Sequence, residues 1–103
     1  ISGGFNVYPK EVETEIDGMD GVVESAVFGV PHADFGEGVT AAVVCKPGAS
    51  ITASAIAKAL EDRLAKFKLP KQVFIVPELP RNTMGKVQKN LLRDQYKDIY
   101  AAK

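Results

Sequence analysis

The chain has 103 residues, 46% hydrophobic and 25% charged, a composition typical of one globular domain with a modest core. Lys plus Arg and Asp plus Glu each total 13, so the net charge is zero and gives no sign of a nucleic-acid partner. The single cysteine excludes an internal disulfide, and the apolar runs are far shorter than the roughly 20 residues that span a membrane. Because no signal peptide is visible and Ile1 is not a natural start, we expect a piece of a longer cytoplasmic protein without a membrane partner.

The first predicted helix follows a glycine turn and a short extended segment. Pro9 suits its first position, and Gly18 and Gly21 are typical of its end. Its apolar stripe consists of Val12, Ile16 and Met19. Two strands then follow, over residues 22–30 and 39–46. Because the loop between them is short, the two strands should pair antiparallel.

The second half of the sequence predicts two helices around one more strand. Thr52 is expected to cap a helix that ends at Leu69-Pro70 and carries on one face Ile56, Leu60, Leu64 and Phe67. Residues 72–76 are apolar in the manner of a central strand, and a last helix should run from about Val87 to Tyr100. The expected fold is an α+β domain in which helices cover a small three-stranded sheet.

Lys86 is the most informative candidate for chemistry. It follows Gly85 on a loop that we expect to open the last helix, where a positive charge opposes the helix macrodipole and invites an anionic partner. The alternative is a solvated surface lysine. A phosphate-binding P-loop is excluded, because Pro80 replaces its first glycine and Val87 replaces its hydroxyl residue.

Other motifs have an ordinary structural interpretation beside a functional one. Gly3-Gly4 would let a ligand lie against the backbone, or would simply make a tight turn. Phe35 at a loop tip is either a stacking platform or a cap over the sheet. Three lysines near Leu69 form a local basic cluster that is either solvated or meets phosphates, namely Lys66, Lys68 and Lys71.

Metal-dependent and nucleophilic catalysis are not indicated. His32, Asp34 and Glu37 share a short loop, but their spacing matches no closed metal site. Cys45 lies in the middle of an apolar strand and is expected to be small core filler. No Ser-His-Asp or Cys-His arrangement is formed around the sole histidine, so we predict no metal site and no such triad.

Five segments of the chain form a pattern when they are taken together in order, namely Gly3 to Glu13, Gly29 to Pro31, Phe35 to Glu37, Phe67 to Lys71 and Pro80 to Lys86. In this order they closely resemble the C-terminal domain of the adenylate-forming enzymes, and bacterial malonyl-CoA synthetases in particular. The resemblance covers the whole chain, 1–103, and implies the mobile C-terminal domain of an AMP-forming acyl-CoA synthetase. It also implies that the family's hinge residue and a large N-terminal domain, which binds Mg-ATP and the acyl group, precede Ile1. The 103-residue piece alone is therefore expected to be inactive.

The resemblance also implies residue roles. Lys86 would neutralise charge as the carboxylate and ATP meet, and Gly85 would let its loop enter the cleft. In the second step, after a domain rotation, Gly3 and Gly4 would line the tunnel for the pantetheine of coenzyme A. Phe35 would stack on the adenine of coenzyme A, whose phosphates would contact Lys66, Lys68 and Lys71.

Two further expectations come with this assignment. Lys86 would be a site of regulatory acetylation, with a lysine acetyltransferase and a deacetylase as partners, because acetylation removes its charge. The alternative function is an adenylation-domain fragment that loads a carrier protein and acts as an interaction module.

Overall fold

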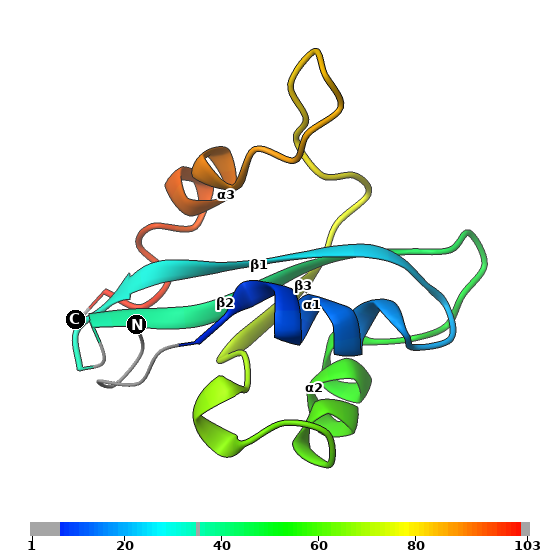
Figure 1. The fold of residues 1–103 in the computed structure, drawn as a ribbon, viewed down its shortest axis with the longest axis horizontal. Helices are drawn as coiled ribbons and strands as arrows, with labels where there is room; N and C mark the ends of the chain where they lie inside the picture. Colours follow the sequence, from blue (N-terminus) through cyan, green and yellow to red (C-terminus); the bar gives the residue numbers. More distant parts are fainter. Residues whose placement is uncertain (1–6, 35, 102–103) are drawn as a thin grey trace.

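A three-stranded sheet separates two layers of helices in the computed structural model, which describes residues 7–34 and 36–101 (Figure 1). Strand β1 (Val22–His32) pairs antiparallel with β2 (Gly36–Cys45), and β2 pairs parallel with β3 (Gln72–Ile75). The strand order is β1-β2-β3, so β2 is central. The predicted antiparallel pairing of the first two strands is confirmed.

The helices lie on both faces of the sheet. Helices α1 (Pro9–Asp17) and α2 (Ala53–Glu61), with a 3-10 turn η1 (Lys66–Lys68), form one layer. Helix α3 (Lys89–Gln95) lies on the opposite face (Figure 1). This arrangement confirms the predicted α+β class with three helices around three strands.

Each face of the sheet has its own buried cluster. The cluster on the α1–α2 side contains Val12, Ile16, Met19, Val22, Val27, Val39, Ala41, Val43, Ile56 and Leu60. The cluster on the α3 side contains Ala26, Phe28, Val30, Ala42, Leu79 and Leu92. Alternate residues of β1 therefore enter opposite cores, as the pleat of a strand requires. Cys45 is half-buried beside the first cluster, which fits its expected role as core filler.

The local start signals that the sequence predicted are present. Pro9 begins α1, and the backbone N–H of Gly18 caps its end. Thr52 caps α2, because its Oγ1 accepts a hydrogen bond of 3.1 Å from the N–H of Ala55.

The β1–β2 hairpin is longer than predicted: pairing continues to His32 and Gly36, so most of the expected loop 31–38 is strand.

The predicted central position of the third strand was wrong. Strand β3 lies at the edge of the sheet, and Ile75 is 44% exposed. Its apolar sequence has a different cause, since both of its faces have partners. Val73 packs against the α1–α2 cluster, and the ring of Phe74 stacks on Tyr96 with centroids 4.4 Å apart.

Three predicted helix boundaries were also wrong. Helix α2 ends at Glu61 with Asp62 as its C-cap, although Leu64 still packs on the core, and the backbone of Ala65 is extended before η1. Helix α3 begins at Lys89 and ends at Gln95, whereas residues 87–100 were expected. Within residues 7–34 and 36–101, no helix combines the length and apolar character that crossing a membrane requires.

Candidate functional site

Lys86 lies on an exposed loop, residues 82–86, which we call the lysine loop. It projects away from the sheet on the α3 side (Figure 1). Lys86 lies on a loop before the last helix, as predicted, but α3 begins only at Lys89, so the lysine does not directly precede the helix. Val87 instead forms an antiparallel bridge with Arg81, and the N–H of Gln88 donates to the carbonyl of Pro80 at 2.8 Å. The lysine is thus held by a closed turn and not by a helix end.

The side chain of Asn82 fixes the internal shape of the lysine loop. Its Oδ1 accepts hydrogen bonds from the N–H of Met84 at 2.9 Å and from the N–H of Lys86 at 3.0 Å. The backbone N–H of Asn82 in turn donates to the carbonyl of Lys86 at 3.0 Å. Gly85 has φ +82°, a backbone conformation that residues other than glycine rarely adopt. The backbone that carries Lys86 is therefore well determined although it is exposed.

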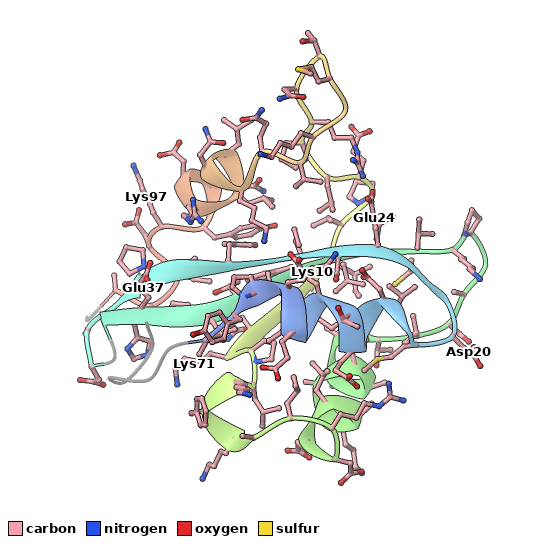
Figure 2. All side chains as sticks on the ribbon, in the orientation of Figure 1. Lys10, Asp20, Glu24, Glu37, Lys71 and Lys97 are labelled. Carbon is pink, nitrogen blue, oxygen red and sulfur yellow. The ribbon has the colours of Figure 1, made fainter. Side chains whose placement is uncertain are left out.

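The lysine loop borders a groove of about 810 Å³ between α1, β1 and α3, which we call the basic groove. Its charged lining residues are Lys10, Glu13, Lys86, Lys89 and Arg93. Lys10 is labelled in Figure 2, where it comes from α1. The four cations outnumber the one carboxylate, in a chain whose net charge is zero.

Among the described residues, one cation of the basic groove has a carboxylate partner and the other three have none. The Nζ of Lys89 lies 2.8 Å from Oε2 of Glu13, which also accepts a hydrogen bond from the N–H of Val27 at 2.8 Å. Among the described residues, no carboxylate lies within ion-pair distance of Lys10, Lys86 or Arg93. Such a groove attracts an anion, and several cations along one groove suit an anion with several charges.

The lysines expected to contact coenzyme A lie in the other layer. Lys66 and Lys68 belong to η1, and Lys71 precedes β3 (Figure 2). The Nζ of Lys68 pairs with Glu11 Oε1 at 2.8 Å, so this lysine already has an anionic partner. These residues and the lysine loop are therefore presented on different faces of the domain. Gly3, Gly4 and Phe35 lie outside the described residues.

His32, the last residue of β1, has structural contacts. Nδ1 of His32 accepts a hydrogen bond of 3.0 Å from the N–H of Asp34, and its ring lies 5.2 Å from that of Tyr100. Among residues 7–34 and 36–101, no group of three His, Cys, Asp or Glu side chains is placed to hold a metal ion.

Sequence reasoning missed several residues of this site. Lys10, Arg81 and Asn82 were part of the motifs but received no role, and the cation Arg93 was not noticed. The motif itself was the available signal for Arg81 and Asn82, since an amide three residues before a glycine is typical of a closed turn. No local signal places Lys10 near Lys86, because the fold brings the two together.

Known proteins resemble this chain over nearly all of its length. The family model of the AMP-binding enzyme C-terminal domain matches residues 11–86. The chain is 52% identical over 97 residues to a 3-[(3aS,4S,7aS)-7a-methyl-1,5-dioxo-octahydro-1H-inden-4-yl]propanoyl:CoA ligase of Rhodococcus jostii, covering 94% of this chain and 19% of that protein. It is 45% identical over 96 residues to the long-chain-fatty-acid–CoA ligase FadD13 of Mycobacterium tuberculosis, covering 93% of this chain and 19% of that protein.

A solved structure is more similar still. Apo MatB from Rhodopseudomonas palustris has 69% sequence identity and a TM-score of 0.95, over 97% of this chain and 20% of that one. This chain thus spans about a fifth of the length of the relatives that it matches. The match over residues 11–86 and the agreement in fold show that the chain belongs to the family of AMP-binding enzyme C-terminal domains.

Proposed function

We propose that this chain is the C-terminal domain of an ATP-dependent, AMP-forming acid–CoA ligase, and that Lys86 acts in its adenylation step. The observation that carries the proposal is the Lys86 ammonium group, held on a closed loop beside the basic groove without a carboxylate partner among the described residues. The names of the relatives, which are CoA ligases, support this reaction class. The domain that binds ATP and the acyl group would belong to the rest of the protein.

In the first step a carboxylate oxygen attacks the α-phosphorus of ATP. The new O–P bond gives an acyl-adenylate, and the bond to the leaving pyrophosphate breaks. Both reactants are anions, so a fixed cation at the meeting point lowers the barrier by electrostatic stabilisation and positioning. At about 4 Å and an effective dielectric constant of about 20, one unit charge interacts with another by about 4 kcal/mol. That energy corresponds to roughly a thousandfold in rate.

In the second step the thiol of coenzyme A displaces AMP and forms the thioester. For this step the expected contacts remain Gly3 and Gly4 with pantetheine and Phe35 with adenine. The proposed contacts of the phosphates remain Lys66 and Lys71, both exposed, and Lys68, which is paired with Glu11.

The acyl substrate that we propose is malonate or a similar short acid. One support is the resemblance of the sequence to bacterial malonyl-CoA synthetases. A second support is the 69% identity to MatB, which is higher than the identity to the named ligases of long-chain or polycyclic acids. Acyl transfer to a carrier protein is the second candidate. It is favoured by 40% identity over 96 residues to the fatty acid–[acyl-carrier-protein] ligase ScoC of Streptomyces coeruleorubidus.

Acetylation of Lys86 is a further part of the proposal. The lysine loop is exposed throughout, with Met84 90% exposed, so a modifying enzyme can reach it. Acetylation would remove the charge on which adenylation depends. Incubation of the chain with a lysine acetyltransferase and labelled acetyl-CoA should label it, and Lys86→Ala should abolish the label.

The adenylation role is tested on the full-length protein that contains this domain. Malonate-dependent exchange of pyrophosphate into ATP should fall by at least about a hundredfold in Lys86→Ala. Thioester formation from synthetic malonyl-adenylate and free coenzyme A should continue. Lys58→Ala, which removes an exposed lysine of α2 in the other layer, should leave both reactions unchanged.

Each other outcome decides against one part of the proposal. Normal pyrophosphate exchange in Lys86→Ala would contradict the role of the lysine. Transfer to a carrier protein but not to coenzyme A would favour the second candidate. Thioester synthesis by the 103-residue chain alone would contradict the need for a second domain.

A further inference from the structure

One arginine joins the lysine loop to the sheet. The guanidinium of Arg81 forms an ion pair through Nη2 with Oε1 of Glu24 on β1. Its Nη1 donates a hydrogen bond of 2.7 Å to the carbonyl of Gly85, the residue before Lys86. The planar fork of arginine allows both contacts at once, which the single ammonium group of a lysine does not reproduce.

The two contacts of Arg81 connect the projecting part of the lysine loop to the sheet, which the other hydrogen bonds of the loop do not. The hydrogen bonds of Asn82 set the internal shape of the loop, and Leu79 and Val87 pack its base on the α3-side cluster. Neither fixes the projecting part of the loop relative to the sheet. The Arg81 side chain runs from Glu24 on the sheet to the backbone beside Lys86, so it restrains the direction in which the lysine points.

Glu24 lies on the α3 side of β1 because of the pleat of the strand, and a β-bulge separates it from Val22. In a regular strand, residues two apart share a face, so Val22, Glu24 and Ala26 would all point to the same side. The pairing of β1 with β2 instead shifts register between Val22 and Glu24. Val22 is buried on the α1–α2 side, whereas Ala26 belongs to the α3-side cluster. The bulge turns Val22 to the other face, whereas Glu24 shares the face of Ala26 and lies on the side of the lysine loop, below the segment that leads to it (Figure 2).

The exposure of the pair argues against a role in stability. The side chains of Arg81 and Glu24 are 40% and 32% exposed, and ion pairs exposed to this degree contribute little to the free energy of folding. Catalytic positioning is far more sensitive, since a displacement of about 1 Å can cost about a hundredfold in rate. We propose that Arg81 and Glu24 are positioning residues that hold Lys86 for adenylation. This inference rests on the proposed function of Lys86.

The test compares the two half-reactions in the full-length protein. Arg81→Lys, Arg81→Met and Glu24→Gln should each lower pyrophosphate exchange by roughly tenfold to a hundredfold. The same variants should keep thioester formation from malonyl-adenylate and the wild-type melting temperature. In the Arg81→Met background, Glu24→Gln should add little, because the partner through which Glu24 acts is already gone.

A matched control comes from another exposed ion pair. Arg63 and Glu15 lie 3.9 Å apart with side chains 44% and 37% exposed, in the α1–α2 layer far from the lysine loop. Arg63→Met removes the same charge at similar exposure and should leave both half-reactions unchanged. A loss of exchange in this variant would mean that the effects at Arg81 reflect general charge or stability.

The remaining outcomes separate this inference from the proposed function. If Lys86→Ala abolishes exchange while the Arg81 and Glu24 variants keep it, the positioning role is wrong and the function of Lys86 stands. If Lys86→Ala keeps pyrophosphate exchange, the proposed adenylation role of Lys86 is itself wrong. Equal losses in both half-reactions, or strictly additive effects of the two substitutions, would also contradict positioning.

Discussion

The ring of Tyr100 covers the place where Gly38 lacks a side chain. A Cβ on Gly38 would lie 2.6 Å from Cε2 of the tyrosine, closer than real contacts allow. The Tyr100 hydroxyl also lies 2.9 Å from Oγ1 of Thr40, in hydrogen-bond distance on the same strand. The segment after α3 is therefore attached to β2 by one aromatic residue, whose fit depends on the missing side chain.

Gly38→Ala should destabilise the chain by about 1–3 kcal/mol, because the tyrosine ring must move from its place. Gly29→Ala is the matched control on β1. Its Cβ would lie 2.7 Å from Oε2 of Glu37, the end of a flexible side chain that can rotate away, so the cost should be smaller. Urea unfolding of both variants checks the difference. Equal losses, or a Gly38→Ala cost that persists in a Tyr100→Ala background, would contradict the steric explanation.

Burial raises the pKa of the Tyr100 phenol above its usual value of 10.0, and the hydrogen bond with Thr40 opposes the shift in part. The folded chain therefore keeps this proton to a higher pH than the unfolded chain does. The corresponding stabilisation is complete below about pH 10 and is lost as the pH rises through the folded-state pKa.

Tyr100→Phe should cost about 0.5–1.5 kcal/mol near neutral pH, through the lost hydrogen bond with Thr40. Above about pH 10 the difference in unfolding free energy between the wild type and this variant should shrink, since only the wild type loses the tyrosine contribution. Urea unfolding of both proteins at several pH values measures that difference. A difference that is constant or grows at alkaline pH would contradict the assignment.

Much of the fold could be predicted because its signals are local. Pro9 and Thr52 begin their helices through backbone and capping effects that involve only neighbouring residues. The edge position of β3 could not be predicted in this way. Its apolar residues reflect contact with Tyr96 on one face and the α1–α2 cluster on the other, and a central strand has the same composition.

The candidate site also contains residues that could be predicted from the sequence and residues that could not. Lys86 and Gly85 were found because the motif is contiguous, and the φ of +82° at Gly85 agrees with the choice of glycine. Glu24 was not found, because it is 57 residues from Arg81 in sequence and only the tertiary fold brings the two side chains together.

Gly85 and Gly48 provide a matched pair for testing whether the shape of the lysine loop matters to adenylation. Their φ values are +82° and +80°, and at both positions a Cβ would meet nothing within 4 Å among the described residues. Alanine at either position therefore adds the same backbone strain, roughly 1 kcal/mol, without a steric clash. Gly48 lies in the turn after β2, whereas Gly85 carries the carbonyl that Arg81 holds.

We expect Gly85→Ala and Gly48→Ala to lower the unfolding free energy equally, as urea titration of the chain would measure. Pyrophosphate exchange by the full-length protein should fall only in Gly85→Ala, because relief of the strain there changes the direction of the Lys86 side chain. Exchange that falls equally in both variants would indicate lost stability alone. Exchange unchanged in both variants would show that the conformation of Gly85 does not position the lysine.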